Sequence, residues 1–159
     1  MKIGVISDTH SLLLPKKLLN ELSKVDLIIH AGDVCDEDTL KSLRKIQELR
    51  AVQGNMCDSS VKKKLPLKEC FECEGVQIGI YHGHQGSTRD AMSNAREQFQ
   101  GIPMDIIIFG HSHQAFNQTI DGILFLNPGS PNDVIKAKFF SYGLIEIHNG
   151  KVKAEIIKL

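Results

Sequence analysis

Seven side chains with metal-binding chemistry are spread over separate short segments of the chain. They are two carboxylates, one amide and four imidazoles, at Asp8, His10, Asp33, Asn55, His82, His111 and His113. Mixed oxygen and nitrogen donors suit Mn²⁺, Zn²⁺ or Fe²⁺ better than Mg²⁺, which prefers oxygen alone. With a bridging carboxylate, such a set has the chemistry of a two-metal hydrolytic site. Each residue alone could be an ordinary loop residue, so the prediction rests on the combination.

Every one of these residues follows a short apolar segment that is typical of a buried strand. The expected strands cover residues 3–6, 27–29, 51–52, 76–81 and 106–109. In open α/β sheets, ligands bind at the carboxyl ends of the strands. We therefore expect the loops after these strands to converge on one crevice.

Amphipathic segments separate the first strands, which predicts βαβ units and a largely parallel sheet. Residues 18–22 and 40–46 each place leucine or isoleucine side chains on one helical face, the second behind a predicted cap at Asp36, and residues 87–99 also favour a helix. Further on, Asp121-Gly122 and Asn149-Gly150 are tight-turn signals between alternating segments, so antiparallel hairpins are expected there. The prediction is a single α/β domain over residues 1–159, whose second half contributes a second sheet.

Bulk composition excludes several classes of function. The 159 residues are 42% hydrophobic and 24% charged, which is typical of a folded soluble domain. Nineteen basic residues balance nineteen acidic ones, so no overall field would attract a nucleic-acid backbone or an anionic membrane. The chain starts with a strand-like run, and its apolar runs are too short to span a bilayer. We expect a cytoplasmic protein that does not enter membranes.

The motifs resemble those of the calcineurin-like metallophosphoesterases, whose series is D-x-H, G-D, G-N, H and G-H-x-H. Here they stand, in order, as Asp8-Thr9-His10, Gly32-Asp33, Gly54-Asn55, His82 and Gly110-His111-Ser112-His113. His82-Gly83-His84 and the segment 127–130 are similar to the small bacterial and archaeal phosphodiesterase branch, which also contains the retromer scaffold subunit of eukaryotes. For the segment 127–130 itself we favour a structural role. The resemblance implies a four-layer αββα sandwich of two mixed β-sheets flanked by helices, the metallo-dependent phosphatase-like fold.

The same resemblance implies two divalent metal ions and a ligand for each position. Asp8, His10 and His113 would hold the first ion. Asn55, His82 and His111 would hold the second, and Asp33 would bridge the two. Manganese is expected, with Zn²⁺, Fe²⁺ or Ni²⁺ as alternatives. The implied reaction is attack of a metal-bridging hydroxide on a small phosphodiester.

One departure from the wider family concerns the leaving group. Many members have a histidine directly after the motif asparagine, where it helps to protonate the leaving group, but this chain has Met56. A thioether cannot donate a proton. His84 and Asp58 are therefore the candidate catalytic acids, although either could simply be a loop residue.

Two other functions compete with a small-molecule phosphodiesterase. A non-catalytic interaction scaffold of the retromer-subunit type could have lost metal ligands, whereas this chain keeps all seven. A nuclease acting on long nucleic acid is disfavoured by the neutral charge balance, two Tyr and no Trp. The sequence names neither the substrate nor the oligomeric state, and a homo-oligomer stays open.

Overall fold

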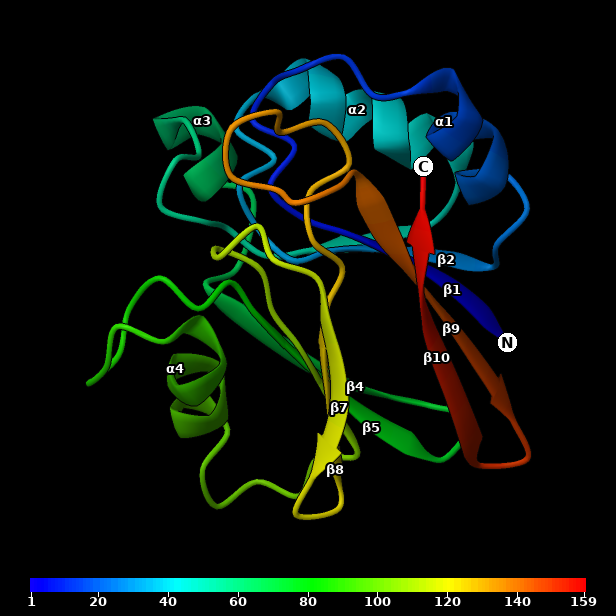
Figure 1. Cartoon of the computed structure of the whole chain (residues 1–159), viewed down its shortest axis with the longest axis vertical. Helices are drawn as coiled ribbons and strands as arrows, with labels where there is room; N and C mark the ends of the chain where they lie inside the picture. Colours follow the sequence, from blue (N-terminus) through cyan, green and yellow to red (C-terminus); the bar gives the residue numbers. More distant parts are fainter.

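Two five-stranded mixed sheets lie face to face in the computed structural model, which describes residues 1–159 (Figure 1). The strand order is β10-β9-β1-β2-β3 in the first sheet and β4-β5-β6-β8-β7 in the second. The strands are β1 (Lys2–Ile6), β2 (Leu27–His30), β3 (Leu49–Ala51), β4 (Lys68–Cys73), β5 (Val76–Tyr81), β6 (Ile106–Ile108), β7 (Phe116–Ile120), β8 (Ile123–Asn127), β9 (Ser141–His148) and β10 (Lys151–Lys158). The helices are α1 (Lys16–Leu22), α2 (Glu37–Ile46), α3 (Ser59–Lys62) and α4 (Ala91–Gln98).

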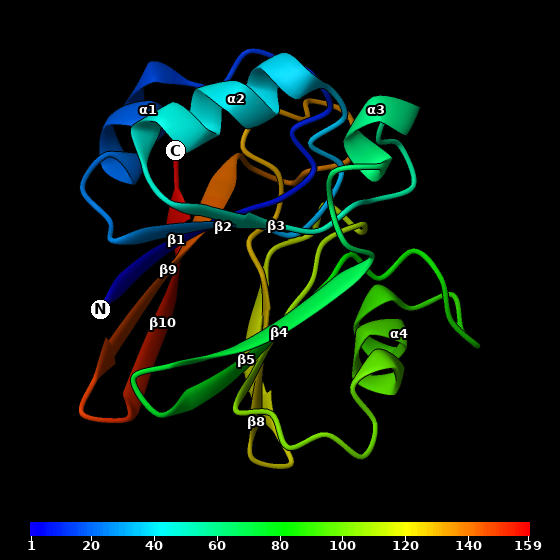
Figure 2. The same cartoon turned by 180° about the vertical axis from the view of Figure 1, so that it is seen from behind.

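Three apolar clusters separate four layers, because successive side chains of a strand point to opposite faces of its sheet. In β6, Ile106 and Ile108 pack between the two sheets, while Ile107 packs under α4. In β2, Ile29 lies between the sheets and Ile28 faces α1 and α2. Figure 2 shows α1 and α2 over the first sheet and α4 against the second. The expected αββα sandwich is confirmed.

The path of the last hairpin differs from the prediction. The second half of the chain does build the second sheet, but β9 and β10 return to the first one, where β9 pairs antiparallel with β1 (Figure 1). Ile145 and Ile147 of β9 then join the core between the sheets. The hairpins themselves are confirmed, since β7–β8 and β9–β10 turn at Asp121-Gly122 and Asn149-Gly150 with positive φ at all four residues.

Helix boundaries follow the capping chemistry. Asp36 caps α2 as expected, because its side chain accepts a hydrogen bond from the Thr39 N–H at 2.8 Å. The helix expected over residues 87–99 begins only at Ala91. There Asp90 is the cap and accepts from the Ser93 N–H at 2.8 Å.

The parallel strands place their carboxyl ends together. β1, β2 and β3 run parallel to one another, and so do β5 and β6. The loops that leave these strands meet, as shown by the hydrogen bond from the Gly110 N–H to the His82 carbonyl at 3.1 Å. This meeting point is where the predicted site residues lie.

None of the four helices has the length and apolar character needed to cross a membrane.

Candidate metal centre

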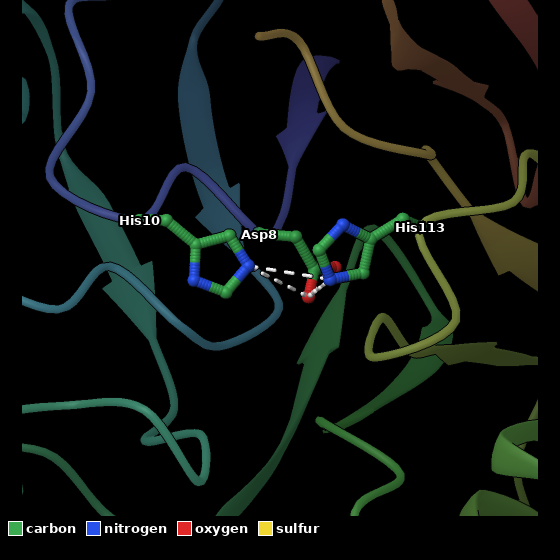
Figure 3. A group of neighbouring side chains, drawn as sticks. All are labelled: Asp8, His10 and His113. Atoms are coloured by element: carbon green, nitrogen blue, oxygen red, sulfur yellow. Dashed lines mark hydrogen bonds and ion pairs between the residues drawn. The ribbon is translucent and has the colours of Figure 1, made fainter. Parts of the chain in front are cut away.

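The Asp8 carboxylate is at the middle of a cluster of imidazoles. Its Oδ1 lies 3.3 Å from Nε2 of His113 and 3.9 Å from Nε2 of both His10 and His82. The Nε2 atoms of His10 and His113 are themselves 3.2 Å apart (Figure 3). On the other side of the cluster, Oδ2 of Asp33 lies 3.3 Å from Nε2 of His82. The structure thus brings together five of the seven predicted ligands.

These five residues form two groups with spacing suited to a metal ion. One is Asp8, His10 and His113, and the other is Asp8, Asp33 and His82, each with donor atoms within 4.8 Å of one another. The shared carboxylate is Asp8, whereas the family resemblance gives the bridging position to Asp33. Oδ1 of Asp33 accepts a hydrogen bond from the Met56 N–H at 2.7 Å, and the other oxygen, Oδ2, faces Nε2 of His82.

Three of the imidazoles present Nε2 to the centre because each Nδ1 has a partner on the far side. The partners are the carbonyl oxygen of Ala31 for His82 at 2.8 Å, the carboxylate of Asp133 for His113, and the thiol of Cys35 for His10 at 3.6 Å. An Nδ1–H that donates to a carbonyl or carboxylate leaves a lone pair on Nε2. His82 and His113 are therefore held in the tautomer that a metal ligand needs.

Two buried polar atoms at the centre have no hydrogen-bond partner. They are Oδ1 of Asp8 and Nε2 of His82, both in side chains that are fully buried. Leaving such groups unsatisfied disfavours the folded state by about 1–3 kcal/mol each, and more when the group is charged. A cation among these donors would satisfy both atoms. Carboxylate oxygens with imidazole nitrogens suit Mn²⁺, Zn²⁺ or Fe²⁺, so the residues present fit a divalent metal.

The backbone of the site loops is held in an unusual conformation. Five predicted ligands have positive φ, between 47° and 65°, namely Asp8, His10, Asp33, His111 and His113. Residues other than glycine rarely adopt this region, and each instance costs roughly 1–3 kcal/mol. Such strain persists only where the surrounding structure fixes it, and it concentrates at functional sites. The loops are therefore shaped to present side chains rather than to maximise stability.

The last residue of β8 and the segment that follows it fasten two of these loops. The Ser130 hydroxyl donates to the Asp8 carbonyl at 2.9 Å, and the Asn127 side chain donates to the Gly110 carbonyl at 2.9 Å. Both residues are fully buried. These contacts support the structural role favoured for the segment 127–130.

Asp133 is a site residue that the sequence did not reveal. The Asp133 carboxylate pairs with Nδ1 of His113. Burial alone would raise the pKa of this carboxyl, but the hydrogen bonds from the Ile135 and Lys136 N–H groups and the contact with His113 outweigh burial, so the pKa is lowered. The only signal was its place three residues after Ser130, in a segment that already resembled the family.

Replacing Asp133 with asparagine should weaken metal binding. The amide keeps an oxygen for the local turn but loses the negative charge that orients His113, so we expect a Kd for Mn²⁺ about 10- to 100-fold higher. Isothermal titration calorimetry on metal-stripped protein measures this. Asp121→Asn, in an exposed turn where Asp121 pairs with Arg96, is the matched control and should keep the wild-type Kd. An unchanged Kd in Asp133→Asn would contradict the assigned role.

The two remaining predicted ligands are less tightly placed. The backbone N–H of His111 donates to Oδ2 of Asp8 at 3.1 Å, and its ring meets that of His82 edge-on with centroids 5.3 Å apart. Asn55 is exposed, and its side chain makes no polar contact with the other predicted ligands. It borders the centre through the next residue, Met56, whose N–H binds Asp33.

The two candidate acids differ in position. His84 packs against Tyr81, His82 and His111, with ring centroids 5.4 Å from His82. Burial, together with His82 and His111, lowers the pKa of His84 to about 4, so its imidazole is neutral at pH 7. Asp58 is exposed at the start of α3 and contacts none of these histidines through its side chain. His84 therefore supplies no imidazolium beside the centre at neutral pH.

Asp33 is strongly held in its ionised form. Burial would raise the pKa of its carboxyl, but the neighbouring His82 imidazole and the hydrogen bond from the Met56 N–H outweigh burial and lower it to about 2. At neutral pH this carboxylate is therefore available to a cation.

The chain is similar in sequence and fold to known proteins. Residues 1–150 match the calcineurin-like phosphoesterase superfamily domain. The chain is 42% identical over 135 residues to a probable metallophosphoesterase of Methanocaldococcus jannaschii, covering 82% of this chain and 68% of that protein. It is 28% identical over 144 residues to a phosphodiesterase of the same organism, covering 81% and 83%. The crystal structure of wild-type Vps29 complexed with Zn²⁺ from Entamoeba histolytica is similar with a TM-score of 0.76, 27% identity and 99% of each chain covered.

Proposed function

Because this chain belongs to the calcineurin-like phosphoesterase superfamily, we propose that it is a divalent-metal-dependent phosphodiesterase acting on a small phosphodiester. The observation that carries the proposal is Oδ1 of Asp8, a buried oxygen without a hydrogen-bond partner that is faced by Nε2 of three histidines. The similarity to an archaeal phosphodiesterase supports diesters over monoesters as the substrate class.

The proposed ligands divide between two metal positions. Asp8, His10 and His113 would hold one ion, Asn55, His82 and His111 would hold the other, and Asp33 would be shared between them. Asp8 also belongs to the second group of donor atoms, so it would contribute to both positions. We propose Mn²⁺, with Zn²⁺, Fe²⁺ and Ni²⁺ as alternatives. When bound, the ions would supply positive charge for the phosphate oxygens and lower the pKa of a coordinated water toward about 7.

The protein's own groups would prepare the site in three ways. Ala31 and Asp133 fix the orientation of His82 and His113, so the donor atoms need no rearrangement when a cation arrives. Asp33 contributes a fixed negative charge. The neutral His84 lies beside the centre and would assist the leaving group as an N–H donor, while Asp58 is the more distant alternative.

Hydrolysis of bis(p-nitrophenyl) phosphate with added Mn²⁺ tests the proposal. Wild-type protein should turn it over, and Asp33→Asn should lower kcat at least about 100-fold, since losing a metal ligand removes several kcal/mol of transition-state stabilisation. Asp121→Asn serves as the control with wild-type activity. Metal binding without turnover of any phosphodiester would reject the proposal in favour of a non-catalytic interaction scaffold.

A further inference from the structure

Large apolar side chains are exposed at the loops that carry the metal centre. Five of the seven exposed large hydrophobic residues of the chain lie there, and we call them the apolar rim: Leu12, Leu13, Met56, Val134 and Ile135. Each follows a site residue by one to three positions, namely His10, Asn55 or Asp133. Scattered exposed hydrophobics are ordinary on protein surfaces, but their gathering in one place marks a contact with an apolar partner.

Hydrogen bonds hold two of the rim segments together. The Asn132 side chain donates to the carbonyls of Thr9 and Leu12, at 3.1 and 3.3 Å, and so ties the loop after β8 to the loop after β1 (Figure 1). Oδ1 of Asp133 accepts from the Ile135 N–H at 2.7 Å. The side chains of Leu13 and Ile135, 96% and 88% exposed, are thus displayed by loops that the site itself fastens.

Met56 belongs to the same arrangement. Its N–H binds the Asp33 carboxylate at 2.7 Å, while its side chain is 59% exposed. The carboxylates of Asp33 and Asp133 therefore each use one oxygen toward a histidine of the centre and the other toward the backbone of the rim. The same two carboxylates therefore position both the histidines of the centre and the backbone of the apolar rim.

A groove extends the apolar surface next to the metal centre. It has a volume of about 410 Å³ and starts at Ser11, directly after His10. Its lining combines leucines with an acidic and polar wall: Leu12, Leu13, Leu14, Leu19, Asp36, Asp38, Thr39 and Ser42. The acidic wall repels a second phosphate group, and the leucines suit an uncharged group. This charge pattern disfavours a polyanionic ligand in the groove.

We propose that the substrate is a phosphodiester with one uncharged, apolar ester group, aryl or alkyl, which packs against the apolar rim and its groove. The inference rests on the proposed function, because a diester whose phosphate lies at the centre must direct its ester groups outward, toward the surrounding loops. Those loops present Leu12, Leu13, Val134 and Ile135 to that group. The apolar group sets affinity and does not take part in bond cleavage.

Two diesters with the same leaving group test the substrate class. Phenyl p-nitrophenyl phosphate and methyl p-nitrophenyl phosphate both release p-nitrophenolate and differ only in the second ester group. We expect the ratio of their kcat/KM values, phenyl over methyl, to fall about tenfold in the double variant Leu13→Ser, Ile135→Ser, through KM rather than kcat. Ile102→Ser removes an exposed apolar side chain elsewhere and should leave both activities at wild-type values. A ratio unchanged in the double variant would overturn the inference.

A binding experiment separates this inference from the proposed function. Calorimetry on Mn²⁺-loaded protein should show phenylphosphonate binding about tenfold more tightly than methylphosphonate, with the difference lost in the double variant. If no diester is hydrolysed but this preference holds, the proposed function fails and the apolar subsite stands. Equal binding of the two phosphonates overturns the subsite. A wild-type dimer that the double variant converts to monomer, with phenylphosphonate affinity unchanged, also overturns it and makes the rim a contact between copies.

Discussion

Replacing Asp8 with asparagine should abolish hydrolysis, with kcat at least about 1,000-fold below wild type. Asp8 belongs to both groups of metal-ligating atoms, so one substitution weakens both positions. The loss of a charged ligand removes several kcal/mol of charge stabilisation, and each 1.36 kcal/mol is tenfold in rate. The amide can still accept the His111 N–H that Oδ2 accepts at 3.1 Å, so the loop should keep its shape. Steady-state assays of bis(p-nitrophenyl) phosphate with Mn²⁺ provide the measurement.

The same variant should lose the stabilisation that metal gives to the folded protein. At a Mn²⁺ concentration 100 times Kd, each occupied position stabilises the native state by about 2.7 kcal/mol. For a chain of this size that corresponds to a rise in Tm of about 5–10 °C per position. Calorimetric scans with and without Mn²⁺ should show this rise in wild type and in Asp121→Asn, and its loss in Asp8→Asn. A full rise in Asp8→Asn would place the metal elsewhere in the protein.

The early strands and their site residues could be predicted from sequence because local patterns determine them. Short apolar runs mark β1, β2, β5 and β6, and a polar residue that ends a parallel strand has only one edge of the sheet on which to lie. The position of β9–β10 could not be predicted in this way. The alternation of Ile145 and Ile147 suits the inner face of either sheet, and only pairing with the free edge of β1 decides between them.

Helix α4 illustrates a second limit. Ser87, Thr88 and Asp90 all have side chains that can cap a helix, so the sequence allowed an earlier start. In the structure the Thr88 hydroxyl lies within hydrogen-bond distance of two acceptors, the Asn94 side-chain oxygen at 2.9 Å and the Asp90 carbonyl at 3.1 Å. Thr88 is thereby used in the loop, and Asp90 becomes the cap.

The contacts that orient the centre were harder to predict than the ligand positions. Asp133 contacts His113, which lies twenty residues earlier in the sequence, and no spacing rule predicts this contact. The apolar rim is also invisible in sequence, because Val134 and Ile135 would suit a buried strand as well as a surface loop. Tertiary structure alone shows that they are exposed beside the site.

A glycine that precedes a predicted ligand can be required in this site for a steric reason and not only for its backbone conformation. Gly54 precedes Asn55 and does not have positive φ, so alanine would be acceptable to its backbone. An added Cβ would, however, overlap the carboxylate of Asp33 and lie 2.5 Å from the Asp33 backbone nitrogen. Because that neighbour is backbone, it cannot move aside as a flexible side chain would.

Gly54→Ala should therefore displace Asp33 and damage both stability and metal binding. Overpacking of this kind lowers the free energy of unfolding by about 1–3 kcal/mol, measurable by urea denaturation. Gly122→Ala is the comparison: nothing lies within 4 Å of the added Cβ there, but its φ of 81° makes alanine unfavourable by roughly 1–2 kcal/mol. Both variants should lose stability, yet only Gly54→Ala should raise the Kd for Mn²⁺ in calorimetry. Equal Kd values in the two variants would show that close packing at Gly54 does not position Asp33 for the metal.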